Sequence, residues 1–160
     1  MNEPPTPKAV LRDEMRKLLR EMSPEDRETF SEEICDRVMR LPQWQEAQSV
    51  VLFSPLPSEP LTSLLKSDCD ARHIPVFVIP QTARTETELH LPEAMDLILV
   101  PGLAFSKDRH RLGRGGGFFD RLLAGRAAQA FKLGVCFSFQ QLDSVPTDAH
   151  DILMDAVVSD

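Results

Sequence analysis

Apolar residues recur with helical spacing over the first quarter of the chain. From Val10 to Met22 they stand on one stripe, which predicts a helix buried along one side. A second stripe ends at Leu41 and follows Ser23, a residue type that caps helices, with a proline at the first helical position. We expect the second helix to end at Leu41, because the residue before a proline is pushed out of the α region.

The rest of the chain alternates short apolar runs with helical segments. Strands are predicted at 49–53, 73–79, 97–100, 131–137 and 156–158. Two further helices are expected over 61–70 and 118–130, and a short turn over 140–142. Strands of this length that alternate with helices are typical of an α/β domain with a mainly parallel sheet.

Two segments have the composition of loops. Ser54–Pro60 is interrupted by prolines, and Gln81–Met95 is polar and weakly patterned, with room for at most a short edge strand. Neither segment is a linker, and the sequence contains no internal repeat. We therefore expect residues 1–160 to form a single domain, as the length of 160 residues also suggests.

Composition argues against membrane-spanning and secreted proteins. The longest nearly apolar stretch, Leu97–Phe105, has nine residues, whereas a membrane span needs about twenty. The first eight residues hold three prolines and no apolar core, so they do not resemble a secretory signal. Cys35, Cys69 and Cys136 lie far apart and are odd in number, which predicts buried, reduced thiols in a cytoplasmic protein.

Charge is distributed unevenly along the chain. The formal net charge of −7 argues against a nucleic-acid-binding face over the whole chain. Residues 107–126, in contrast, hold six Lys or Arg and two Asp, a local net charge of +4. Four of the seven glycines fall within residues 113–117. The positive charge and the glycines, both scarce elsewhere in this chain, therefore lie in the same segment. A role in contacting RNA through this basic segment is a weak alternative.

The glycines and arginines of residues 111–121 predict an anion site. Glycines let backbone N–H groups approach a phosphate, while the start of the following helix and the arginine forks add positive charge. Neither GxxxxGK[ST] nor GxGxxG fits, since the latter would need glycine where Phe118 stands. A merely flexible surface loop remains the alternative to a phosphate site.

Asp120 in the first turn of that helix has two possible roles. It could interact with the helix dipole, or it could bind Mg²⁺, which proteins usually hold by one or two carboxylates together with nucleotide phosphates. The four histidines and three cysteines show no zinc spacing, and no GxSxG motif of a serine hydrolase occurs.

At this loop the sequence resembles the 5-formyltetrahydrofolate cyclo-ligases, also called methenyltetrahydrofolate synthetases. The resemblance rests on VPGLAF at 100–105 and RLGRGGGFFDR at 111–121. Weaker matches follow in the family's order: Lys8, Leu11 and Arg12, then 58–62, 145–146, 150–151 and 155–158.

The resemblance implies a three-layer α/β/α fold and the Mg-ATP-dependent conversion of 5-formyltetrahydrofolate to 5,10-methenyltetrahydrofolate through a phosphorylated formyl oxygen. It implies ATP and a reduced folate as partners, without nucleic acid or membrane, and we expect a monomer. The implied nucleotide-binding residues are Lys8, Arg12, Arg111, Leu112, Gly113, Arg114, Gly115, Gly116, Gly117, Phe118 and Phe119.

The same resemblance implies catalytic roles for Arg111 and Asp120. Asp120 and Asp151 would hold Mg²⁺, and Ser54 and Glu59 would bind the folate. Simpler interpretations stay open for several of these residues. Lys8 and Arg12 could form a solvated helix face, Glu59 an ordinary loop charge, and His150 with Asp151 a polar turn.

The chain departs from the family pattern in two places. Arg114, Phe118 and Phe119 stand where the family has tyrosines. Gln81–Met95 has only fifteen residues, where the family carries a much longer segment with a Glu-Pro element near the folate. The shortened segment predicts weaker folate binding beside ordinary nucleotide binding. It also leaves a second function open, a nucleotide- or phosphate-binding module that has lost folate turnover.

Overall fold

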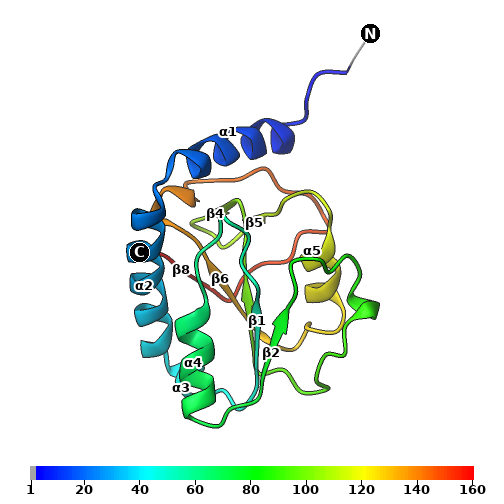
Figure 1. Ribbon diagram of the computed structural model, residues 1–160. Coiled ribbons are helices and arrows are strands. Elements are labelled where there is room, and N and C mark those ends of the chain that lie inside the picture. The colour runs from blue at the N-terminus through cyan, green and yellow to red at the C-terminus, as the bar shows by residue number, and fades with distance from the viewer. Residues whose placement is uncertain (1–2) are drawn as a thin grey trace.

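A five-stranded parallel sheet forms the centre of the molecule in the computed structural model, which describes residues 3–160 (Figure 1). The strands are β1 (Val50–Phe53), β2 (Val76–Ile79), β3 (Leu97–Val100), β6 (Phe131–Val135) and β8 (Ala156–Val158). Their order across the sheet is β2-β1-β3-β6-β8, and every neighbouring pair is parallel. The prediction of a mainly parallel α/β sheet is confirmed.

Helices cover both faces of this sheet. One face carries α2 (Pro24–Arg40), α3 (Pro42–Glu46) and α4 (Ser63–Ala71), and the other carries α5 (Phe118–Ala124) (Figure 1). Helix α1 (Pro7–Glu21) runs across one end of the sheet. Val50 and Leu52 pack into the core on the α2 side and Val51 into the core on the α5 side. The central strands β1 and β3 are buried on both faces, and the expected three-layer architecture is confirmed.

The helix boundaries near the N-terminus follow capping chemistry. Thr6 accepts a hydrogen bond from the amide of Ala9 and Ser23 one from the amide of Asp26, so side-chain oxygens satisfy free N–H groups at both helix starts. Leu41, which precedes a proline, has extended backbone and ends α2. Both expected N-terminal helices, the Ser23 cap and the Leu41 boundary are thus confirmed.

A second, small sheet was not predicted. It consists of β4 (Ala104–Ser106), β5 (Arg111–Leu112) and β7 (Gln141–Leu142), with β4 in the middle. β5 runs antiparallel to β4 and β7 parallel to it. Two or three residues carry too little alternation to be recognised as a strand. This sheet matters for the site because β5 fixes the position of Arg111.

Several predicted boundaries were wrong. The helix expected over 118–130 ends at Ala124, where Gly125 leaves helical geometry, and strand β2 begins only after Pro75. The five-residue helix α3, which buries Trp44, was not predicted. Residues 140–142 continue a short 3₁₀ helix, η2 (Ser138–Gln140), into β7. The 81–95 segment contains a 3₁₀ turn, η1 (Glu86–Glu88), and is otherwise a loop as predicted.

The three cysteines are buried and unpaired, as predicted. Burial raises the pKa of Cys35 and Cys69 to about 11 and that of Cys136 to about 12, so the thiols stay protonated near neutral pH. Within residues 3–160, the helices are all too short or too polar to cross a bilayer.

Candidate active site

A cavity of about 570 Å³ opens at the carboxyl ends of β1, β2 and β3. This is where parallel α/β sheets usually bind ligands, and the volume lies in the range of small-molecule sites. The loops after β1, β2 and β3 line it together with the glycine loop, defined here as residues 113–117. The N-terminal half of α1 closes a further side through Lys8 and Arg12.

The glycine loop has a backbone that only glycine adopts easily. Gly115 and Gly117 have φ angles of +108° and +76°, in the left-handed region. A side chain at Gly116 would meet no atom within 4 Å, so this position faces open space beside the cavity. Arg12 and Arg16 from α1 hold the loop by donating to the carbonyls of Gly113 at 2.9 Å and Arg114 at 3.1 Å.

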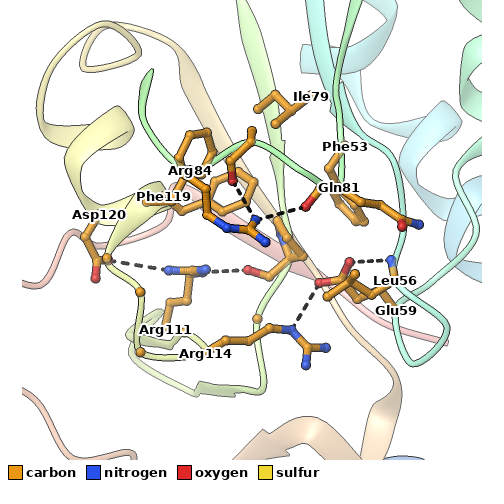
Figure 2. Close-up of a pocket in the computed structure, with 18 of the residues that line it drawn as sticks. Phe53, Leu56, Glu59, Ile79, Gln81, Arg84, Arg111, Arg114, Phe119 and Asp120 are labelled. Atoms are coloured by element: carbon orange, nitrogen blue, oxygen red, sulfur yellow. Dashed lines mark hydrogen bonds and ion pairs between the residues drawn. The ribbon is translucent and has the colours of Figure 1, made fainter. Parts of the chain in front are cut away.

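Arg111 lies beneath this loop with 7% of its side chain exposed. Its Nε donates to the Pro101 carbonyl at 2.6 Å, one Nη lies 3.4 Å from Asp120, and the guanidinium covers the Phe119 ring at 5.3 Å (Figure 2). Burial lowers the pKa of Arg111 to about 10, although the negative charge of Asp120 acts to raise this pKa. The group therefore stays cationic at neutral pH and is held rigidly at the cavity wall.

Lys8 and Asp151 pair with each other. The Lys8 ammonium lies 2.7 Å from Asp148 and 3.2 Å from Asp151. Burial acts to lower the pKa of Lys8, but the hydrogen bonds it donates to both carboxylates raise it above its ordinary value. Asp151 also accepts the amide of Asp148 at 2.8 Å. Lys8 and Asp148 line the cavity, whereas Asp151 does not.

Glu59 is buried on the opposite wall, in the loop after β1. One of its oxygens accepts the Leu56 amide at 2.8 Å, and the other lies 3.5 Å from Nε of Arg114 (Figure 2). Arg27 of α2 stabilises this loop by donating hydrogen bonds to the carbonyls of Leu56 and Glu59. Arg114, which also donates to Ser58 at 2.9 Å, joins this wall to the glycine loop.

The structure brings most of the predicted site residues to one cavity. The predicted residues that line it are Lys8, Arg12, Ser54, Glu59, Arg111, Gly113, Arg114, Gly115, Gly116, Gly117, Phe118, Phe119 and Asp120. Leu112 and Asp151 are the exceptions. The Leu112 side chain is buried in the core on the α2 side. Successive side chains of a strand point to opposite faces, so in β5 Arg111 points toward the cavity and Leu112 points away from it.

Sequence reasoning missed other lining residues. These are Phe53, Leu56, Ile79, Pro80, Gln81, Ala83, Arg84, Pro101, Gly102 and Asp148. Most of them are the last residue of a strand of the parallel sheet or stand within two residues after it. That placement is the signal that could have identified them, because carboxyl ends of parallel strands share one edge.

A single carboxylate of the cavity is suited to a divalent cation. The Asp120 side chain is 44% exposed and makes one long contact with Arg111. Among residues 3–160 no cluster of three or more acidic, histidine or cysteine side chains could hold a metal ion alone. Mg²⁺ commonly takes one or two protein carboxylates and completes its shell with phosphates and water. Asp120 fits this pattern, whereas Asp151 is occupied by Lys8.

Sequence comparison gives matches along the whole chain. The profile of the 5-formyltetrahydrofolate cyclo-ligase family matches residues 5–91 and 74–160. A mouse 5-formyltetrahydrofolate cyclo-ligase is 26% identical over 187 aligned positions, which cover 94% of this chain and 92% of the mouse protein. A Mycoplasma pneumoniae 5-formyltetrahydrofolate cyclo-ligase is 37% identical over 75 residues, 47% of this chain and 45% of that protein.

The alignments also show that residues are missing here. Since 94% of 160 residues is about 150, about 37 of the 187 positions aligned with the mouse protein have no counterpart in this chain. The two family matches overlap at residues 74–91. This overlap includes the start of the 81–95 segment, where we expect this chain to be shorter than its family.

Solved structures share the fold. A 5,10-methenyltetrahydrofolate synthetase from Mycoplasma pneumoniae superposes with a TM-score of 0.80 at 23% identity, over 95% of this chain and 98% of that one. The NMR structure of the Aquifex aeolicus 5,10-methenyltetrahydrofolate synthetase gives a TM-score of 0.79 at 26% identity, over 96% and 89%. With both halves of the chain matched by the family profile, this chain belongs to the 5-formyltetrahydrofolate cyclo-ligase family.

Proposed function

We propose that the protein uses Mg-ATP to convert 5-formyltetrahydrofolate to 5,10-methenyltetrahydrofolate. The observation that carries the proposal is the meeting of two unlike walls in one cavity. The glycine loop with Arg12, Arg111 and Arg114 offers N–H groups and cations, while the loop after β1 offers a buried carboxylate beside apolar side chains. The family membership of the chain supports the same reaction.

The glycine loop is the proposed phosphate site. Gly116 has open space where a side chain would stand, so a phosphate oxygen can approach the backbone there. Arg12 and Arg111 bring charge from two sides, and the charge-assisted hydrogen bonds of arginine forks suit phosphates. Lys8 can join this set by exchanging one of its carboxylate partners for a phosphate oxygen.

Asp120 is the residue we propose for Mg²⁺. It stands in the first turn of α5, directly after the glycine loop, and one of its oxygens lies toward Arg111. When bound, Mg²⁺ would neutralise charge on the ATP phosphates. Asp151 is the second predicted ligand, and taking that role requires it to separate from Lys8.

The proposed folate wall contains Ser54 and Glu59. A buried carboxylate accepts hydrogen bonds from ring N–H groups, as a pteridine presents them, and Glu59 has one oxygen free of backbone contacts. Phe53, Leu56 and Ile79 add an apolar surface against which a flat ring can pack. Arg114 holds this wall at a fixed distance from the glycine loop through Glu59 and Ser58.

The proposed chemistry has two steps. The formyl oxygen attacks the γ-phosphorus of ATP and ADP leaves; N10 then attacks the activated formyl carbon, phosphate leaves, and N10 loses its proton. Phosphoryl transfer depends mainly on positioning and on charge around the phosphates. Arg111, buried and fixed by Pro101, supplies such a charge without having to reorganise.

The test is an assay of turnover. The protein is incubated with 5-formyltetrahydrofolate and Mg-ATP, and the methenyl product is followed by its absorbance, with parallel reactions lacking ATP or containing EDTA. Product that needs both ATP and Mg²⁺ is expected. Nucleotide binding without turnover would instead favour the phosphate-binding module, the alternative that the short 81–95 segment supports.

A further inference from the structure

Arg84 differs from the other cations of the cavity. The lining cations are Lys8, Arg12, Arg84, Arg111 and Arg114. Three of them are paired with carboxylates, and Arg12 donates to the backbone of the glycine loop. Within residues 3–160, no carboxylate lies within 4.0 Å of the Arg84 guanidinium, which makes long hydrogen bonds of 3.3–3.5 Å to two nearby carbonyls. Arg84 is thus a cation available to a ligand.

The backbone that carries Arg84 is held in place. Gln81 donates to the Pro55 carbonyl at 2.5 Å, which joins the loop after β2 to the loop after β1. The Ala83 amide donates to Pro80 at 3.1 Å. Arg121 of α5 donates to the Arg84 carbonyl at 3.2 Å. The exposed side chain therefore starts from a fixed point at the edge of the cavity (Figure 2).

The position of Arg84 associates it with the folate wall. In Figure 2 its side chain points toward the part of the cavity bounded by Phe53, Ile79 and Phe119. Through Gln81 its loop contacts the segment that contains Ser54 and Glu59. The phosphate site already has the glycine loop, Arg12 and Arg111. Arg121 holds the Arg84 backbone beside the glycine loop, but the Arg84 guanidinium faces apolar side chains of the cavity, where a different anion can bind.

We propose that Arg84 binds a carboxylate of the glutamyl part of the folate substrate, an assignment that rests on the proposed function. The negative charge of a reduced folate is carried by its glutamyl carboxylates, remote from the pteridine. A pteridine against Glu59 and the apolar wall directs the glutamyl part outward, toward the cavity edge where Arg84 is exposed. The planar guanidinium fork matches a carboxylate in two hydrogen bonds. Arg84 thus provides a contact to the folate from the 81–95 segment, the segment that we expect to be short in this chain.

The test compares two folate ligands. Dissociation constants are measured by calorimetry for 5-formyltetrahydrofolate, for 5-formyltetrahydropteroate, which lacks the glutamyl group, and for ATP. Arg84→Ala is expected to weaken 5-formyltetrahydrofolate binding about tenfold or more, the effect of losing a charge-assisted contact. Pteroate and ATP binding should not change. Arg84→Lys, which keeps the charge without the fork, should give a smaller loss.

The matched control is Arg20→Ala, which removes the same charge from an exposed position of α1 outside the cavity and should change none of the three constants. Equal weakening of folate and pteroate, weakening of ATP alone, or no change in Arg84→Ala would each overturn the assignment while leaving the proposed function intact. If the unsubstituted protein binds no 5-formyltetrahydrofolate, the assignment and the proposed function fail together.

Discussion

The glycine loop and the 81–95 segment line the same cavity but are held in different ways. The glycine loop is fixed at both of its ends, by Arg12 and Arg16 of α1 and by Arg121 of α5, which donates to Gly116 at 3.0 Å. Its two left-handed glycines make the conformation specific to its sequence.

The 81–95 segment has fewer constraints for its length. Contacts hold it at Gln81, Arg84 and Glu86 and at its far end, where Leu91 and Met95 are buried, and its regular structure is a single 3₁₀ turn. The comparison teaches that most of the proposed phosphate site, apart from Lys8 and Arg12 of α1, lies in one short motif. The proposed folate site depends on residues brought together by the fold, and its contacts can change when a loop is shortened.

The largest effect is expected at the helix that follows the glycine loop. Asp120→Asn keeps the side-chain shape and removes the charge that would hold Mg²⁺, so kcat should fall roughly 100-fold or more. The fold should persist, because the loss at a helix N-terminus is only about 0.3–1 kcal/mol. Rates are measured across a magnesium titration, with Asp36→Asn on the exposed face of α2 as control. An unchanged magnesium dependence would leave Asp120 with a helix-dipole role.

The short segment itself predicts the next effect. The absence of two or three polar or stacking contacts, each worth about 1 kcal/mol, should raise the KM for 5-formyltetrahydrofolate roughly 30- to 150-fold above that of a relative with the longer segment. The KM for ATP should be ordinary, and the more open cavity should allow some uncoupled ATP hydrolysis. Steady-state kinetics with each substrate varied in turn, run beside the mouse relative, measure both.

The Mycoplasma pneumoniae relative provides a second reference for this experiment. Its 75 aligned residues are 45% of its length, so it has about 167 residues, close to the 160 of this chain. If a shorter chain lowers the affinity for folate, the folate KM of the Mycoplasma pneumoniae relative should lie nearer to that of this protein than to that of the mouse relative. A low folate KM with tightly coupled turnover here would show that the missing residues are dispensable.

At the phosphate side, Arg111→Ala should weaken ATP binding about 10- to 150-fold, the equivalent of a charge-assisted contact of about 1.5–3 kcal/mol. Because Arg111 is buried against Pro101 and Phe119, thermal unfolding is monitored as well, and Arg111→Lys provides a variant with less loss of packing. Lys107→Ala, an exposed charge on the same hairpin, is the control for calorimetry. Wild-type ATP affinity in Arg111→Ala would remove Arg111 from the proposed phosphate site.

The main elements of the fold could be predicted because parallel strands are buried on both faces. Runs such as Val50–Phe53 and Leu97–Val100 are continuously apolar for that reason. The small sheet could not be predicted, since β5 has two residues and its pairing with β4 depends on the turn between them. Likewise, a helix extrapolated past Gly125 was too long, because periodicity does not mark where a helix stops.

In the candidate site, the residues that could be predicted are those that lie together in a short sequence motif. The glycine loop, Arg111 and Asp120 are contiguous in sequence and could be identified together. Arg84 lies in a segment without any pattern, and its lack of a carboxylate partner is a property of the folded structure. The Lys8–Asp151 pair spans most of the chain, and no sequence spacing predicts such a contact.

The smallest effect is expected at Arg121, the side chain that joins the two regions. It is half-exposed and donates to Gly116 and Arg84 while lying 3.5 Å from Glu86. Arg121→Ala should cost about 0.5–1 kcal/mol, a decrease in Tm of roughly 2–4 °C. The glycine loop keeps Arg12 and Arg16, so amide hydrogen exchange should accelerate more in 81–95 than in 113–117. Arg40→Ala on α2 removes an equal charge and should accelerate neither, whereas equal acceleration of both regions in Arg121→Ala would contradict the difference in how they are held.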